Sequence, residues 1–182
     1  MNQELLEQIA ENLVSLAEQV KGACVEASHT VQLPLQDVRA GYPEAALAAL
    51  KSWVAAGGND AQYIYQVSAS EGMVIDDLHK AFSLAKDNKT GGRAYARLHH
   101  ASRCLYVGSS SSPMARLKQH LGFGAKGTYA MQIRYWLPPQ SSGSLKIDVW
   151  RFSKETPKAV IQVIEDGLWA SRQPMFGRQG AR

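Results

Sequence analysis

Apolar side chains recur at helical spacing over the first twenty positions of the chain, with Glu and Gln between them, at Leu5, Ile9, Leu13, Leu16 and Val20. This period predicts an amphipathic helix. Residues 43–56 are rich in Ala and Leu and precede a Gly-Gly-Asn-Asp turn, which predicts a second helix. We therefore expect residues 1–60 to form a helical N-terminal cap with a packing or partner-binding role.

The period changes after residue 60. Residues 61–67 are aromatic and β-branched between turn signals, which predicts a strand, and residues 103–108 and 145–152 are predicted as two more. Helical spacing returns over residues 73–86, 113–121, 129–136 and 159–171. The serines at 109–112 are predicted to form a loop and a helix cap, and residues 174–182 an irregular basic tail.

Size and composition limit the class of protein. A chain of 182 residues, 45% hydrophobic and 20% charged, is sufficient for one domain with an extension and excludes disorder over most of its length. No apolar run approaches a membrane span, and the acidic N-terminus is unlike a signal peptide, so we expect a cytoplasmic protein without a membrane partner. Cys24 and Cys104 lack the spacing of a zinc or disulfide framework and are predicted to be free thiols.

The charges are unevenly distributed along the chain. Residues 1–60 carry eight acidic and three basic side chains, a net charge of −5, whereas residues 61–182 carry 17 basic and eight acidic ones, a net charge of +9. A basic region of this size favours a polyanionic partner such as nucleic acid. A basic surface that serves only solubility explains the charge alone equally well.

Candidate catalytic residues occur in two predicted strands and two predicted helices: Tyr65, Tyr106, Arg116, His120 and Glu165. Arg116 and His120 stand four residues apart and therefore share a helix face. Taken singly, a strand tyrosine usually packs in the core, and a helical Arg, His or Glu usually faces solvent. Taken together, the order and spacing of these five residues favour a catalytic site.

The order and spacing over residues 61–177 resemble the GIY-YIG nuclease superfamily. The resemblance is carried by Ile64, Tyr65, Tyr106, Val107, Gly108, Arg116, Leu117, His120, Glu165, Leu168 and Pro174. It implies an α+β fold with a small three-stranded antiparallel sheet flanked by helices, preceded by the helical extension. The catalytic domain would then span 61–182, with an insertion at 68–103 that we expect to form a helix and a basic loop beside the site.

The resemblance also implies the chemistry, a metal-dependent hydrolysis of DNA phosphodiester bonds with Mg²⁺ or Mn²⁺. Glu165 would bind the metal ion, Arg116 would hold the phosphate, and Tyr65 would act as the general base. Tyr106 would hydrogen-bond the phosphate or the attacking water. His120 would either accept the tyrosine proton or contact phosphate, and these two roles stay open.

Further basic residues are candidates for holding the nucleic acid: Arg93, Arg97, Arg103, Lys118, Lys126 and Arg178. The N-terminal helices are candidates for a partner protein or for self-association. The sequence does not distinguish DNA from RNA or one DNA structure from another.

The chain departs from the family pattern at two positions. Tyr63 stands where the first motif has glycine, and Gly177 stands where the family often has asparagine. These departures keep a second hypothesis open, a catalytically weakened GIY-YIG-like module that binds nucleic acid or protein. The retained Tyr65, Arg116 and Glu165 favour the enzyme.

Overall fold

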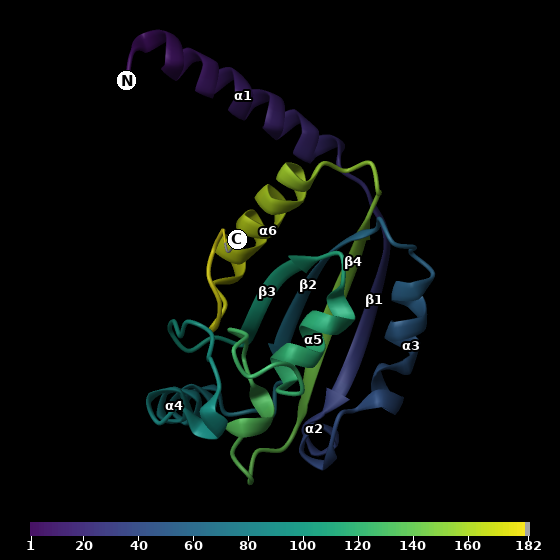
Figure 1. Ribbon diagram of the computed structural model, residues 1–182, viewed down its shortest axis with the longest axis vertical. Coiled ribbons are helices and arrows are strands. Elements are labelled where there is room, and N and C mark those ends of the chain that lie inside the picture. Colours follow the sequence, from purple (N-terminus) through teal and green to yellow (C-terminus); the bar gives the residue numbers. More distant parts are fainter. Residues whose placement is uncertain (181–182) are drawn as a thin grey trace.

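The computed structural model describes residues 1–180 and contains a four-stranded antiparallel sheet (Figure 1). Its strands are β1 (Val25–Pro34), β2 (Gln62–Ala69), β3 (Cys104–Ser110) and β4 (Ser144–Phe152), in the order β1-β4-β2-β3. The α+β class is confirmed, and the expected three-stranded sheet was wrong by one strand. The additional strand, β1, lies within the segment predicted to be a helical cap, so residues 1–60 are not purely helical.

Tertiary contacts explain why the sequence pattern missed β1. Only Val31 and Leu33 of this strand are buried. Its first six residues are exposed or half-buried. The strand pairs with β4 along its length, with Val31 opposite Ile147 and Leu33 opposite Leu145. A strand that buries so few side chains has a weak local signal, and the pairing with β4 decides its conformation.

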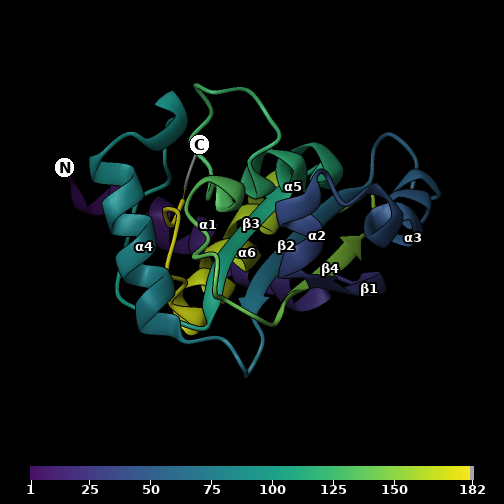
Figure 2. The same ribbon diagram turned by 90° about the horizontal axis from the view of Figure 1, so that it is seen from below.

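Helices cover both faces of the sheet (Figure 2). The helices of the chain are α1 (Gln3–Gly22), which projects away from the sheet, α2 (Leu35–Ala40), α3 (Glu44–Ala55), α4 (Ile75–Asp87), α5 (Pro113–Leu121) and α6 (Lys158–Arg172), with short 3₁₀ turns at Thr90–Gly92 and Ile133–Tyr135. Helix α5 begins at Pro113, which suits the first helical turn, and ends at Gly122, whose φ of +97° is left-handed. The helix expected over 129–136 is reduced to its 3₁₀ turn.

Alternation along β2 divides the apolar side chains between two cores. Tyr63, Tyr65 and Val67 face the larger core, which the helices on the α5 side of the sheet enclose. Ile64 faces the opposite side and packs with Phe152 and Ile161 under α6. Helices α5 and α6 therefore lie on opposite faces of the sheet, as Figure 2 shows.

Residues 174–180, the described part of the C-terminal tail, lie against the free edge of β3. The amides of Met175 and Phe176 donate to the carbonyls of Cys104 and Leu105 at 2.8 and 2.9 Å. On its other side, the amide of Gly177 donates to the carbonyl of Arg97 at 3.0 Å. The tail thus lies between β3 and the end of the insertion, and it brings the neighbourhood of Arg97 to the edge of the sheet.

Candidate active site

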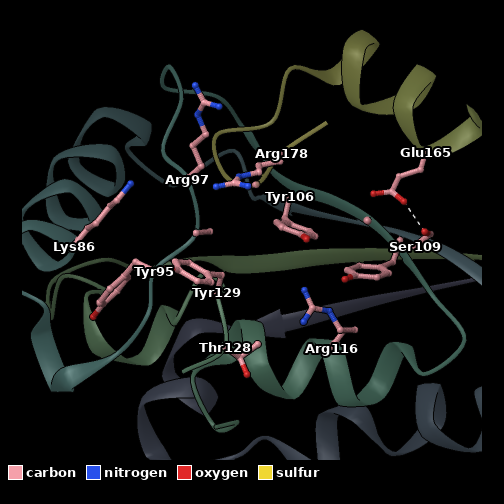
Figure 3. Close-up of a pocket in the computed structure, with 14 residues that line it drawn as sticks. Lys86, Tyr95, Arg97, Tyr106, Ser109, Arg116, Thr128, Tyr129, Glu165 and Arg178 are labelled. Carbon is pink, nitrogen blue, oxygen red and sulfur yellow. Dashed lines mark hydrogen bonds between the residues drawn. The ribbon is translucent and has the colours of Figure 1, made fainter. Parts of the chain in front are cut away.

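A pocket of about 720 Å³ opens at the edge of β3 (Figure 3). Its wall is built by β2, β3, α5, α6, the insertion and the tail, from Tyr65, Lys86, Tyr95, Ala96, Arg97, Tyr106, Gly108, Ser109, Arg116, Thr128, Tyr129, Glu165, Gly177 and Arg178. Four of the five residues predicted to be catalytic, Tyr65, Tyr106, Arg116 and Glu165, line this one pocket. His120 does not line it.

The two tyrosines of the site are set by the pairing of β2 with β3. Tyr65 lies opposite Gly108, and the rings of Tyr65 and Tyr106 stack with centroids 6.0 Å apart. A Cβ atom on Gly108 would lie 2.7 Å from Cε1 of Tyr106 and 3.0 Å from the hydroxyl of Tyr65. The glycine therefore leaves room for both rings against the strand.

His120 lies beneath the tyrosines and is fully buried. Its Nε2 is 3.2 Å from the Tyr65 hydroxyl, and its Nδ1 accepts a hydrogen bond from the Met131 amide at 3.4 Å. Burial, assisted by the charge of Arg116, lowers the pKa of His120 to about 3, so the ring is neutral. Because Nδ1 accepts, the ring proton sits on Nε2 and is donated to Tyr65.

This arrangement favours neither of the two roles left open for His120. Contact with phosphate does not fit a side chain with no exposed surface. Acceptance of the tyrosine proton does not fit an Nε2 that already carries hydrogen. His120 instead orients the Tyr65 hydroxyl and offers a hydrogen bond to its oxygen.

Burial controls the protonation of the tyrosines. It raises the pKa of Tyr65 well above the ordinary value of 10, and the charge of Arg116 opposes this shift. Burial also raises the pKa of Tyr106, again opposed by Arg116. Both phenols are therefore protonated at neutral pH, and each can donate a hydrogen bond into the pocket.

Arg116 extends from α5 toward the tyrosines (Figure 3). It is half-buried, and its guanidinium donates to the side-chain oxygen of Gln119 one turn along the helix. In the part of the chain that the structure describes, no salt bridge neutralises it. Its charge is available to an anion in the pocket.

Glu165 reaches the pocket from the opposite face of the sheet. Its side chain on α6 is only 6% exposed, and its Oε2 accepts a 2.5 Å hydrogen bond from the hydroxyl of Ser109. Ser109 follows Gly108 and therefore points to the other side of β3. Because β3 is the edge strand, the pocket extends around it and receives Arg116 from one face and Glu165 from the other.

The donor set around Glu165 limits which metal ion could bind. Residues 1–180 contain no group of three or more His, Cys, Asp or Glu side chains placed to hold a metal ion, so Glu165 would be a single carboxylate ligand. Figure 3 shows one carboxylate oxygen of Glu165 bonded to Ser109 and the other directed toward the pocket. One carboxylate oxygen, completed by water and a phosphate, fits Mg²⁺. Burial raises the pKa of Glu165, opposed by the Ser109 hydrogen bond.

Two of the six predicted nucleic-acid-binding residues lie at the pocket. Arg97 and Arg178 are exposed and line its wall. Lys86, a basic residue of the insertion at the end of α4, lines the same wall. We call Lys86, Arg97 and Arg178 the basic rim. The expected helix and loop of the insertion are present, and both contribute to this rim.

The other four predicted binding residues lie outside the pocket wall: Arg93, Arg103, Lys118 and Lys126. Arg93 donates to the carbonyl of Gly124 at 2.9 Å and stacks on Tyr135, so it is used within the fold. Arg103 donates to the carbonyl of Ser70 at 2.8 Å. Lys118 lies over the ring of Tyr42, and Lys126 is exposed on a loop.

Sequence reasoning also missed several uncharged residues of the pocket. Ser109, predicted to lie in a loop, is the last but one residue of β3 and bonds Glu165. Tyr129 lines the pocket although 74% of its surface is exposed, and Tyr95 and Thr128 lie in the same wall. No local pattern marks Tyr95, Thr128 and Tyr129, because they meet only where the insertion pairs with the loop after α5, with the Ala96 amide donating to the carbonyl of Ala130 at 2.9 Å.

The structure gives physical reasons for both departures from the family pattern. The hydroxyl of Tyr63 donates to the carbonyl of Val54 at 2.9 Å and fills the space beside Gly57, so this residue joins α3 to the sheet. Gly177 has φ +109° and would place a Cβ 3.0 Å from Cε2 of Tyr106. An asparagine at position 177 would therefore strain the backbone and displace Tyr106.

Comparisons of the chain with protein-family models, with curated proteins and with solved structures found no match. Among the helices of residues 1–180, none has both the length and the apolar character that crossing a membrane requires. The geometry of the pocket is therefore the basis for a functional proposal.

Proposed function

We propose that this protein is a metal-dependent endonuclease that hydrolyses DNA phosphodiester bonds, as its resemblance to the GIY-YIG superfamily implies. One observation carries the proposal. Tyr65, Tyr106, Arg116 and Glu165 come from four separate elements and line a single pocket, with the two tyrosines stacked. A carboxylate, a guanidinium and two phenols in one cleft supply the metal-binding, anion-binding and acid–base groups that phosphodiester hydrolysis uses.

The residues of the pocket match the requirements of phosphodiester hydrolysis, which are an oriented water and stabilisation of charge on the phosphate. Arg116 would bind two phosphate oxygens through its planar guanidinium. Tyr106 would donate a hydrogen bond to the phosphate or the water. A divalent ion held by Glu165 would supply Lewis-acid polarisation of the phosphate.

Tyr65 is the candidate general base of this mechanism. In the free protein its phenol is protonated, because burial raises its pKa. Before it could take a proton from the attacking water, Tyr65 would have to release its own phenolic proton to solvent in the pocket, because Nε2 of His120 already carries hydrogen. The Nε2 hydrogen of His120, 3.2 Å away, and the charge of Arg116 would both stabilise the resulting phenolate.

The basic rim supports DNA as the substrate class. Lys86, Arg97 and Arg178 line the pocket, and Arg116 adds a fourth cation to its wall. Such a group of cations would hold the phosphates that flank the reacting one. The exposed ring of Tyr129 offers a face on which an unstacked base would fit.

A second candidate function is a nucleic-acid-binding module with weakened catalysis. It is favoured by the burial of Glu165, which is 6% exposed and already bonded to Ser109. Gly177 in place of the family's asparagine favours it as well. Both candidates use the same basic rim, so cleavage and binding must be measured separately.

The test replaces Glu165 by glutamine, which keeps the shape and removes the charge. We expect Mg²⁺-dependent cleavage to be abolished while DNA binding stays equal or becomes slightly tighter, because a negative charge near the phosphate is removed. Arg116→Ala should weaken both binding and cleavage, with a rate loss on the order of 10² to 10³. The matched control is Glu155→Gln, an exposed carboxylate on the loop before α6, which should cleave like wild type. Full cleavage by Glu165→Gln would refute the metal-binding role.

A further inference from the structure

Helix α1 projects from the body of the protein (Figure 1), and its apolar side chains are exposed to solvent. Ile9 is 42% exposed, Leu13 61% and Val14 65%, and no residue of this 20-residue helix is buried. Its C-terminal end contacts α6, and there Leu16 and Val20 are half-buried. In proteins, most of the stability of an amphipathic helix comes from packing of its apolar face, so we expect the exposed turns of α1 to have a packing partner.

The apolar residues of α1 follow a heptad pattern. Leu6, Ile9, Leu13, Leu16 and Val20 alternate in spacing between three and four residues. This is the a/d period of a coiled coil, with Leu6, Leu13 and Val20 at a and Ile9 and Leu16 at d. We call these five residues the seam. Its first three members extend past the contact with α6 into solvent.

The charges of α1 indicate which partner fits the seam. Every charged residue of the helix lies at an outer b or f position: Glu4, Glu7, Glu11, Glu18 and Lys21. The e and g positions that flank the seam are all uncharged: Gln3, Leu5, Ala10, Asn12, Ala17 and Gln19. A second copy of the same helix would therefore meet no like charge along the seam, although each copy is acidic.

The same charges disfavour other occupants. Four glutamates against one lysine give α1 a net charge of −3, which repels the phosphates of nucleic acid. A helix that lies on a membrane typically has a basic polar face, whereas the polar face of α1 is acidic. Self-pairing is the arrangement that both the apolar period and the charge placement favour.

We propose that α1 pairs with α1 of a second copy of this chain in a two-stranded coiled coil, which makes the protein a dimer. This interface is separate from the pocket at β3 and does not rest on the nuclease proposal. In a dimer, the solvent-exposed turns of the seam are buried against the partner helix, and the glutamates stay in water.

Two neighbouring residues give a matched pair of variants. Leu13 and Val14 are similarly exposed and touch no core, but Leu13 belongs to the seam and Val14 occupies an outer position. We expect wild type and Val14→Glu to have twice the 19.9 kDa chain mass in sedimentation equilibrium. Leu13→Glu should have the mass of one chain at the same concentration, because the charge would be buried in the pair. Circular dichroism in the aromatic region should be the same for all three.

Each other outcome overturns the proposal. A wild-type protein that stays monomeric at the highest attainable concentration removes it directly. A Leu13→Glu variant that remains dimeric places the interface on another surface. If Leu13→Glu and Val14→Glu dissociate the dimer equally, the interface does not distinguish seam positions from outer positions of α1. Binding of monomeric wild type to phosphatidylserine vesicles, lost in Leu13→Glu, would assign the seam to a membrane instead.

Discussion

At the scale of single residues, Gly108 determines whether the two tyrosines can occupy the pocket. A methyl group there would lie 2.7 Å from the Tyr106 ring, in a strand that is hydrogen-bonded to β2. We predict that Gly108→Ala lowers the free energy of unfolding by about 1 to 3 kcal/mol through overpacking, measured by urea denaturation. Cleavage should fall as well, because the tyrosines must move.

The control for this prediction is Gly167→Ala. Gly167 lies on the exposed side of α6, and a Cβ there would meet nothing within 4 Å. The substitution should stabilise the protein by about 0.5 to 1 kcal/mol, because alanine favours the helix over glycine. Equal destabilisation by the two variants would contradict the steric role assigned to Gly108.

His120 makes stability depend on pH in a defined direction. Its pKa is about 3 in the folded protein against an ordinary 6.5, so below pH 6.5 the unfolded chain binds a proton that the folded one does not. The free energy of unfolding should therefore fall as pH decreases from 6.5, by up to about 1.4 kcal/mol per pH unit from this group. His120→Gln keeps a donor near Tyr65 and should flatten this dependence between pH 7 and pH 5. An unchanged slope would mean that His120 is accessible to protons in the folded state.

At the scale of elements, the free edge of β3 is where the insertion and the tail meet. The tail pairs with β3 and with residue 97, which brings Arg97 and Arg178 to the same pocket. We predict that replacing both arginines by alanine weakens DNA binding and reduces the slope of log affinity against log salt by about 2. The assay is a fluorescence-anisotropy titration over a range of salt concentrations.

The control for the rim is Arg103→Ala. Arg103 is also exposed and basic, but its guanidinium bonds the carbonyls of Ser70 and Glu71 outside the pocket wall. Its substitution should leave the salt dependence unchanged. If Arg103→Ala and the double variant reduce the salt dependence equally, DNA affinity depends on the total surface charge and not on the basic rim.

The elements also indicate what the sequence can and cannot predict. From residue 61 onward, local periodicity predicts the strands and most of the helices. In β2, for example, the neighbours Ile64 and Tyr65 face two different cores, as an alternating strand requires. Strand β1 was missed because it buries few side chains, and the turn at 133–135 is shorter than expected because Gln132 adopts a positive φ of 56°. Arg93 hydrogen-bonds the carbonyl of Gly124, and Lys86 lines the pocket. Both positions depend on how the insertion folds, and no local sequence pattern predicts that fold.

At the scale of the whole molecule, the acidic and basic parts of the chain differ in role. The acidic α1 extends from one end, whereas the basic rim surrounds the pocket at the edge of β3. This separation keeps the glutamates of α1 away from the proposed path of the DNA, and it leaves the first three seam residues, Leu6, Ile9 and Leu13, free to pair. Assembly and cleavage should therefore respond to different substitutions.

The central claim is that the pocket at β3 hydrolyses DNA with a divalent metal ion. The most direct measurement incubates wild-type protein with linear, nicked and branched DNA in Mg²⁺ or Mn²⁺, with EDTA and Glu165→Gln as parallel controls. We predict cleavage of at least one substrate that both controls abolish. Binding without cleavage of any substrate would contradict the claim and favour the nucleic-acid-binding module, as would cleavage that persists in Glu165→Gln.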